Sequence, residues 1–247
     1  MKNKLLLLLF LLCSFPGLTM AQQDLQDTSF QSESVHNSID LYYKSIGENA
    51  HLYNGAEYML YTLYDKEDSK NLYFMSIFLQ NGSVFYDGSL YADVPLTYDL
   101  LHDELVTTRY KQNYRIRLNA DKVGYFDLAG HHFVRVIDDT AHHLPFGTGY
   151  YDLMYDGKSQ VIVKRRKRLE ERLSSAGAIE NYIIDDRFFI KKDGVYYPVK
   201  TKKSVLNVFK DKKKELRKYL RKNKYTFAPH PEFGIVKAAE YYDQIKN

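Results

Sequence analysis

The chain has 247 residues, of which 45% are hydrophobic and 15% aromatic, and its 35 Lys and Arg against 31 Asp and Glu give a formal net charge of +4. That much apolar material can build a core, so wholesale disorder is excluded. The single cysteine excludes a disulfide framework and a zinc site of several thiolates. The length suits one domain, alone or with an appendage.

The first 21 residues have the pattern of a secretory signal peptide. Lys2 and Lys4 precede an unbroken apolar run, Leu5–Leu12. A membrane-spanning helix needs about 20 apolar residues, so this run is too short to be an anchor. The small side chains of Thr19 and Ala21 stand where signal peptidase requires them for a cut after Ala21. We therefore predict an exported protein that is periplasmic or associated with the outer membrane.

Cleavage at this site removes Cys13, so the mature chain has no thiol. A lipid anchor is not expected, because a leucine stands before Cys13 where a lipoprotein signal needs a small residue. Residues 22–37 are rich in Gln, Ser and Asp and predict a flexible leader. An antiparallel β domain is expected over 38–200, and a basic helical segment packed on it over 201–247. No later stretch is apolar enough for a transmembrane helix.

The middle of the chain has the pattern of short antiparallel strands. Arg115–Leu118 alternates polar and apolar residues, as expected of a strand with one buried face. Dipeptides that supply the positive φ of two-residue hairpin turns occur at Asn81-Gly82, Asp87-Gly88, Asp156-Gly157 and Asp193-Gly194. We predict strands at Ser83–Tyr86, Leu90–Tyr98, Glu104–Thr108, Tyr114–Leu118, Val123–Leu128, Phe133–Ile137, Gly149–Met154, Gln160–Lys164, Tyr182–Ile190 and Val195–Val199.

The C-terminal segment changes to a helical pattern. Ser204 can cap a first helix, and Asp211 a second one over Lys212–Lys222. A last amphipathic helix is expected at Ile235–Ile245. Tyr53–Tyr64 fits a strand or a short helix equally well. The prediction is a mainly β, α+β fold, in which an antiparallel meander is curled or barrel-like and two to three helices follow it.

Three landmarks together resemble a known family. The run Tyr86–Leu100 contains a YDG turn and the sequence VPLTYDL, and a DELV sequence follows at Asp103–Val106. The second landmark is GHHFVR at Gly130–Arg135, and the third is the lysine-rich tail that ends in Tyr241 and Tyr242. In this order they resemble a widespread family of exported proteins of Bacteroidota that has no assigned function. The resemblance implies location in the cell envelope and carries no catalytic residues with it.

The near-neutral total conceals two regions of opposite charge. Residues 22–157 hold 9 basic and 20 acidic residues, a formal charge of −11, whereas residues 158–247 hold 24 basic and 11 acidic, a formal charge of +13. Either the basic part packs on the acidic part and neutralises it, or the protein presents two surfaces of opposite sign. We expect partial neutralisation with a basic remainder exposed.

The segment 200–224 has the largest local excess of charge, with 12 basic residues against Asp211 and Glu215. It could attract lipid headgroups, lipopolysaccharide or acidic glycans, or it could be a solvated helix face whose long side chains cover apolar neighbours. Nucleic acid is not an expected partner, because no reader motif is present. The residues that would contact an anionic surface are Lys212, Lys213, Lys214, Arg217, Lys218, Arg221, Lys222 and Lys224. A second basic run, Lys164–Arg168, is expected to be a strand end that enters a charged loop.

Histidines near carboxylates are a secondary candidate for a zinc or copper site. Adjacent residues of a strand point to opposite faces, so neither histidine pair can easily supply two ligands. One histidine of each pair and an aspartate could converge if the segment is a hairpin. These candidates are His131, His132, Asp138, Asp139, His142 and His143. We nevertheless expect no resident metal or cofactor.

A carboxylate cluster of Asp99, Asp103 and Glu104 could supply the acid and base of glycoside hydrolysis. All three fall in one short turn, where such residues are common, whereas that chemistry needs carboxylates that face each other across a cleft. The sequence contains no nucleophile elbow, phosphate-binding glycine loop, HExxH or EF-hand loop.

The sequence therefore predicts an exported cell-envelope protein that is a non-catalytic binding or structural module. Its expected partner is an envelope protein or an anionic surface component. The alternative is an envelope hydrolase that uses carboxylates or a histidine-bound metal, and an enzyme is the less expected of the two. A third class is a small-ligand carrier, if the meander encloses a cavity.

Overall fold

The structure is a computed structural model that describes residues 51–59, 71–109, 114–138, 147–174 and 177–246, together with Ser38. Apart from Ser38, these residues belong to one compact unit that begins at Tyr43. The predicted signal peptide and leader lie outside the described residues, as does the end of Tyr53–Tyr64. The described start of that segment is a 3-10 turn, His51–Tyr53, followed by a two-residue strand.

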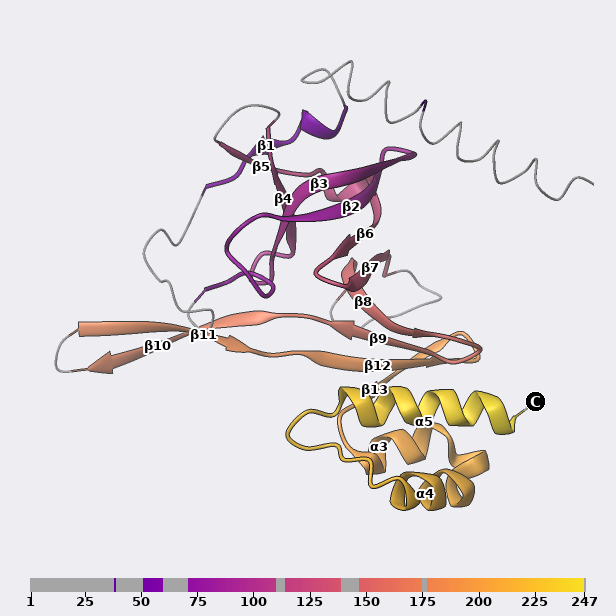
Figure 1. Cartoon of the computed structure of the whole chain (residues 1–247). Helices are drawn as coiled ribbons and strands as arrows, with labels where there is room; N and C mark the ends of the chain where they lie inside the picture. Colours follow the sequence, from indigo (N-terminus) through magenta and orange to yellow (C-terminus); the bar gives the residue numbers. More distant parts are fainter. Residues whose placement is uncertain are drawn as a thin grey trace, which may run out of the picture. The chain divides into compact units, whose positions relative to one another are not determined.

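An antiparallel sheet of 11 strands dominates the unit (Figure 1). The strands lie in the order β1, β5, β4, β3, β2, β6, β7, β8, β9, β12, β13, so two meanders run outward from β2. Their bounds are β1 Ala56–Glu57, β2 Gln80–Tyr86, β3 Ser89–Asp99, β4 Glu104–Thr108, β5 Arg115–Arg117, β6 Val123–Leu128, β7 His131–Val136, β8 Gly149–Asp156, β9 Gln160–Lys164, β12 Arg187–Lys192 and β13 Val195–Val199. A separate hairpin, β10 (Lys167–Ser174) and β11 (Gly177–Ile184), extends beyond the sheet. The predicted mainly β fold is confirmed, and the sheet does not close into a barrel.

The short link between β5 and β6 explains why the sheet curls. Four strand spacings separate β5 from β6 in the sheet order, which would be about 19 Å in a flat sheet. The five residues between Arg117 and Val123 include a 3-10 turn, Ala120–Lys122, which rises only about 2 Å per residue. This link cannot cross a flat sheet, so β5 and β6 must approach each other around a curl. A hydrogen bond from the Asp87 N–H to the Lys122 carbonyl, 2.8 Å long, ties the link to the end of β2.

Aromatic rings fill the inside of the curl. Phe126 and Phe133 stack with centroids 4.7 Å apart, and Tyr98 meets Phe133 edge-on at 5.2 Å. Tyr150 closes the cluster from β8, 5.8 Å from Tyr98. All four rings are at most 1% exposed. The interior of the curl is therefore a packed core.

Three helices follow the sheet: α3 (Lys202–Val208), α4 (Lys213–Lys222) and α5 (Glu232–Ile245). α3 and α5 pack on β8, β9, β12 and β13, whereas α4 packs on α3 and α5 and lies farther from the strands (Figure 1). Strand alternation decides which side chains meet the helices. Val161, Val163 and Ile190 face the helical core, while Ile162 and Phe189 belong to a small cluster of their own.

Both predicted helix caps need correction. Thr201 is the N-cap of α3, and its hydroxyl accepts the N–H of Ser204, whose hydroxyl in turn accepts the N–H of Thr201 at 3.0 Å. Ser204 is thus the third residue of a capping box rather than the cap itself. Asp211 does not cap α4, because it lies in a 3-10 turn, Lys210–Lys212, that separates α3 from α4.

The turn dipeptides are confirmed in part. Asp87-Gly88 and Asp193-Gly194 take positive φ between paired strands, at 51° and 80° and at 50° and 80°. Asn81-Gly82 is wrong as a turn, since it lies inside β2 at a bulge. A Cβ on Gly82 would lie 2.3 Å from the Asp127 carbonyl oxygen, so glycine is required there by the close approach of β6. An unpredicted turn of the same kind occurs at Ala129-Gly130, with φ of 52° and 79°.

The buried tyrosines predict a particular response to alkaline pH. Burial raises the pKa values of the Tyr86, Tyr98, Tyr150 and Tyr151 hydroxyls above that of a free phenol, about 10. The stability they contribute is fully present below the pKa of the unfolded chain and is lost as pH rises above it. In an alkaline titration, we expect one group of tyrosines to ionise together with the loss of circular dichroism, later than the exposed group.

The control is the same titration in denaturant, where all tyrosines should ionise in one step. Ionisation of every tyrosine in a single step while the native circular dichroism persists would contradict this prediction.

Candidate functional site

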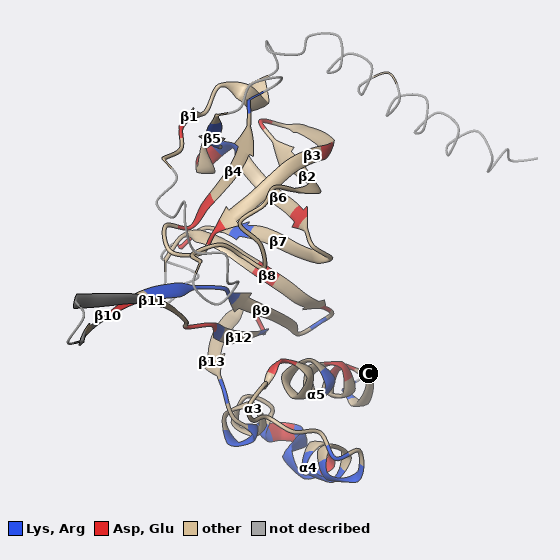
Figure 2. Cartoon of the chain, turned by 60° about the vertical axis from the view of Figure 1, so that its left-hand side comes forward, with Lys and Arg blue, Asp and Glu red and all other residues tan. Residues whose placement is uncertain are grey.

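The basic residues predicted to meet an anionic surface lie on and around α4, the outermost helix (Figure 2). Leu216 and Leu220 are fully buried on its inner side. Lys212 and Lys213 are partly buried where the helix begins. The other six predicted residues are exposed and form what we call the basic face: Lys214, Arg217, Lys218, Arg221, Lys222 and Lys224.

The basic face has little acidic compensation. Glu215 is the one acidic residue of α4, and no residue of the basic face has an ion-pair partner within the described part of the chain. Asp211, which precedes α4, is already bound by Lys192 at 3.0 Å and by the Tyr242 hydroxyl at 2.8 Å. Burial would raise the pKa of Asp211, but these two donors hold it below its ordinary value. Asp211 is therefore engaged elsewhere and does not form an ion pair with the basic face.

Stacked rings hold α4 against its neighbours. Tyr219 of α4 stacks on Tyr241 of α5 with centroids 3.9 Å apart and an interplanar angle of 4°. Phe209, between α3 and α4, stacks on Tyr242 at 4.1 Å. These contacts fix the inner side of α4, so the basic face is presented by a rigid support.

The second basic run was predicted to be a strand end that enters a charged loop. Lys164 does end β9, but the run continues into β10, which begins at Lys167, instead of a charged loop. Lys164, Arg165 and Lys167 are only 5%, 6% and 7% exposed. The Lys167 ammonium donates to the Asn71 carbonyl at 2.7 Å. The loop was predicted wrongly because the burial of these residues depends on partners distant in the sequence: Asp103 for Lys164, Asp152 for Arg165 and Asn71 for Lys167.

Lys164 forms a buried ion pair across the curl. Its ammonium lies 2.5 Å from the Asp103 carboxylate and 3.1 Å from the Tyr150 carbonyl oxygen. Burial lowers the pKa of Lys164, although Asp103 partly offsets this effect. The pair occupies the space above Gly149, where a Cβ would lie 2.2 Å from the Asp103 carboxylate and 2.4 Å from the ammonium. Glycine at this position therefore permits the ion pair.

Arg165 connects the sheet with the helices. Its guanidinium donates twice to Asp152 of β8, at 2.9 and 2.7 Å, and once to Asp186 before β12, at 2.8 Å. It also donates to Glu232 in the first turn of α5. Burial raises the pKa of Asp186 even though Arg165 partly offsets it. These contacts identify a structural ion network. The available sequence signal was the pair of basic residues, Lys164 and Arg165, that follows the apolar run Val161–Val163.

The two described histidines of the metal hypothesis point to different partners. His131 Nδ1 lies 2.8 Å from Asp152, whereas His132 Nδ1 lies 2.6 Å from Asp127, as expected of neighbours on one strand. Asp138 uses its backbone N–H to bind the Thr148 hydroxyl at 2.9 Å. Among the described residues, no group of three or more His, Cys, Asp or Glu side chains is arranged to hold a metal ion. Asp139, His142 and His143 lie outside the described residues.

The predicted carboxylate cluster is divided among separate structural contacts. Asp99 is fully buried and accepts hydrogen bonds from the Tyr58 hydroxyl, at 2.7 Å, and from two backbone N–H groups of its own turn. Asp103 is held by the buried ammonium, and Glu104 pairs with Arg117 at 2.8 Å. Each carboxylate thus has a partner that accounts for its position.

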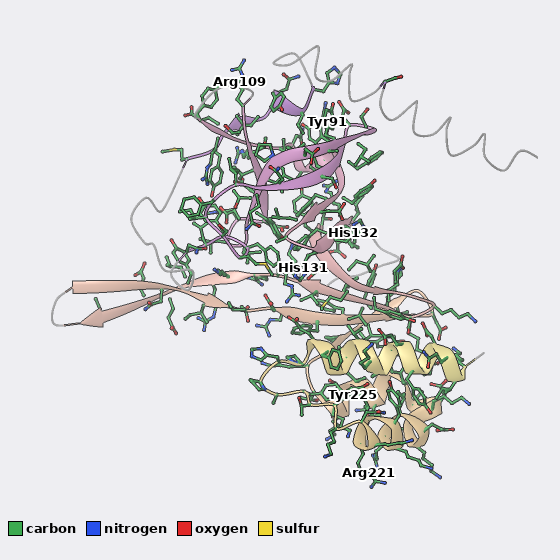
Figure 3. All side chains as sticks on the ribbon, viewed as in Figure 1. Tyr91, Arg109, His131, His132, Arg221 and Tyr225 are labelled. Carbon is green, nitrogen blue, oxygen red and sulfur yellow. The ribbon has the colours of Figure 1, made fainter. Side chains whose placement is uncertain are left out.

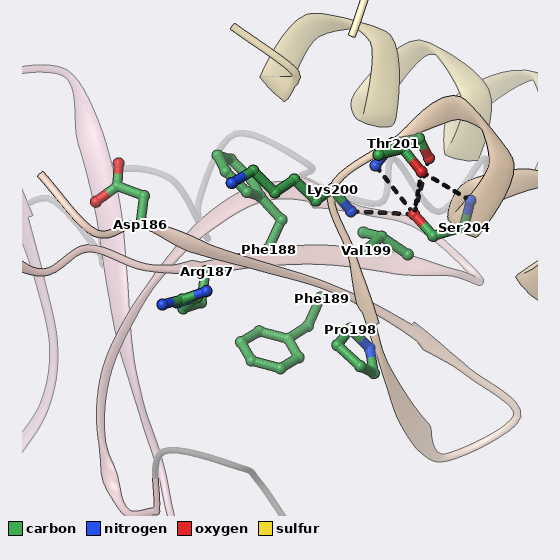
Figure 4. Close-up of a pocket in the computed structure, with 9 residues that line it drawn as sticks. All are labelled: Asp186, Arg187, Phe188, Phe189, Pro198, Val199, Lys200, Thr201 and Ser204. Atoms are coloured by element: carbon green, nitrogen blue, oxygen red, sulfur yellow. Dashed lines mark hydrogen bonds between the residues drawn. The ribbon is translucent and has the colours of Figure 1, made fainter. Parts of the chain in front are cut away.

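A pocket of about 420 Å³ opens beside the β12–β13 hairpin (Figure 4). Phe188, Phe189 and Val199 give it an apolar lining. Asp186 lies at one end and the capping box at the other, and both are already engaged in hydrogen bonds (Figure 4). A second pocket of about 370 Å³ lies between residues 54–56, the turn at Asp103 and Glu104, and the link from Arg117 to Ala120, with Tyr150 of β8 also in its lining. Neither arrangement places a nucleophile beside a general base.

Comparisons of the chain with protein-family models, curated proteins and solved structures find no match. Within the described residues, none of the helices combines the length and the apolar character needed to cross a membrane. The described residues offer the basic face no ion-pair partner, and this geometry is the basis for its interpretation.

The Arg165 network predicts a large loss of stability when its centre is removed. Arg165→Met keeps the length of the side chain but leaves Asp152 and Asp186 without their cation, which should lower the free energy of unfolding by about 3–5 kcal/mol. Chemical denaturation monitored by circular dichroism measures the change.

Arg187→Met is the matched control. Its guanidinium is 45% exposed and pairs with Asp185 at 2.6 Å, so its loss should cost at most about 1 kcal/mol. Equal effects of the two substitutions would contradict a special role for the buried network.

Proposed function

We propose that this protein is an exported, non-catalytic module of the cell envelope that binds an anionic surface component through the basic face of α4. The observation that carries the proposal is the charge of that face, which no described acidic residue neutralises by an ion pair. The buried residues of the acidic and basic halves pair with one another, as in Lys164 with Asp103 and Arg165 with Asp152. The positive charge of α4 is therefore left for an external partner.

The geometry favours attraction to a surface over recognition of one small ligand. The side chains of the basic face are long and exposed, and they spread along α4 and just beyond its end instead of converging on a pocket. Lys and Arg near an anionic membrane surface contribute about 1 kcal/mol each, and the effect falls off within a Debye length. Such binding is additive and sensitive to salt.

Charge reversal tests this proposal. The triple variant Lys214→Glu, Lys218→Glu and Arg221→Glu should bind vesicles that contain anionic lipid about two orders of magnitude more weakly, because three favourable contacts are lost. Co-sedimentation of the protein with vesicles, at low and physiological salt, measures the change.

The matched control reverses Lys122, Lys158 and Lys200, three exposed residues outside α4, and changes the net charge equally. Its adsorption should change much less. Unchanged adsorption of the α4 variant, or an equal loss in both variants, would overturn the proposal.

Export is tested separately by the N-terminus of the protein recovered from its host. We expect the chain to begin at Gln22, since Thr19 and Ala21 precede the cut. N-terminal sequencing and the intact mass measure this. Recovery of a chain that retains Met1 in the cytoplasm would contradict an envelope location.

A further inference from the structure

One exposed aromatic residue lies beside the basic face and outside the helical core. Phe233, in the first turn of α5, is 59% exposed. It is the one large hydrophobic residue that is exposed in segment 201–246, all of which the structure describes. A single exposed apolar side chain needs no explanation by itself, so its surroundings must decide whether it matters.

A chain of aromatic contacts joins Phe233 to α4. The Phe233 ring meets Tyr225 edge-on, with centroids 5.3 Å apart, and Tyr225 lies 5.6 Å from Tyr219 of α4. The Tyr225 N–H also donates to the Leu220 carbonyl at 3.1 Å, which holds it at the end of α4. Figure 3 shows Arg221 at the outer surface of α4 and Tyr225 in the connection that leads to α5. Phe233 therefore stands on a rigid aromatic support at the same end of the helix as the last basic residues.

Phe233 also has a cation against its ring. The Lys237 ammonium lies 5.5 Å from the centre of the Phe233 ring and 2.7 Å from Glu240. Lys224 directly precedes Tyr225, on which Phe233 rests. An exposed aromatic ring with basic residues near it is a combination that the boundary between lipid headgroups and acyl chains accommodates.

The inner side of α4 cannot supply an apolar contact to a membrane. Leu216 and Leu220 are fully buried between the helices, so exposing them would require the helical layer to come apart. Stable attachment to a bilayer generally needs two contributions, attraction of charge and burial of apolar surface. The basic face supplies the first, and Phe233 is positioned to supply the second.

We infer that the partner of the basic face is a bilayer that carries anionic lipid, and that Phe233 enters the interfacial region while α4 lies on the headgroups. This inference rests on the proposed function and names its partner. An acidic glycan would satisfy the charges equally well but offers no apolar region for the ring. The fate of Phe233 on binding therefore distinguishes a bilayer from an acidic polysaccharide.

The absence of tryptophan from the sequence makes a direct test possible. Phe233→Trp introduces a single fluorescent reporter at the proposed contact. With vesicles that contain anionic lipid, its emission should shift to shorter wavelength and its quenching by acrylamide should fall several-fold. Vesicles of neutral lipid should leave both unchanged.

The matched control is Phe78→Trp, at a position that is 75% exposed and lies two residues before β2 (Gln80–Tyr86) of the sheet. Its emission should stay that of a solvated side chain under all conditions. Phe233→Ala should weaken vesicle binding about tenfold, as expected when part of a phenyl ring is no longer buried, whereas Phe78→Ala should not. Thermal unfolding of each variant shows whether the fold is retained.

The outcomes separate this inference from the proposed function. If the protein binds anionic vesicles in a salt-dependent way but the emission of Phe233→Trp stays unchanged, the inference is overturned while the proposed function stands. If heparin, as a soluble polyanion, produces the same spectral shift, the shift does not report insertion into a bilayer. That outcome also overturns the inference while the proposed function stands. If the protein binds neither vesicles nor heparin, both proposals fail together.

Discussion

The arrangement of sheet and helices in this protein depends on the ion pairs of one buried group, the guanidinium of Arg165. It binds Asp152 of the sheet, Asp186 at the start of β12 and Glu232 at the start of α5. Removing a charge from water costs several kcal/mol, so such a network is stable only when all of its partners are in place. The helices are therefore attached to the sheet by ionic contacts as well as by apolar packing. Because α5 supports α4, the same network determines where the basic face stands.

The opposite charges of the two halves of the chain pair inside the molecule but not at its surface. Inside, Lys164 and Arg165 carry positive charge from the basic half into contact with Asp103 and Asp152 of the acidic half. Outside, α4 keeps its charge, because α3 and α5 stand between it and the sheet. The expected partial neutralisation is thus achieved mainly by residues of the sheet, and the exposed basic remainder is the helix.

Sequence patterns predicted the features that depend on neighbouring residues. Alternation located most strands, and Asp87-Gly88 and Asp193-Gly194 form the turns expected of them because a two-residue turn is a local structure. The turn predicted at Asn81-Gly82 was wrong, because Gly82 instead allows another strand to approach closely. The dipeptide alone cannot reveal such a contact. The burial of Arg165 was missed for the same reason, since its partners are 13, 21 and 67 positions away. The exposure of Phe233 could not be predicted from the sequence, because it depends on how α5 packs.

The layered arrangement of the helices decides whether the charge of α4 can act outside the molecule. Packed helices have axes about 8–10 Å apart, and the Debye length at physiological ionic strength is about 8 Å. One layer of helices therefore separates α4 from the sheet by about a Debye length or more, and its attraction to exposed carboxylates beyond that layer is largely screened by salt. Apart from Glu215 of α4 itself, Asp211 before the helix and Glu240 of α5 are bound to Lys192 and Lys237. A bilayer that approaches the basic face would thus meet its charge directly, with the edge of the aromatic cluster at Phe233 beside it.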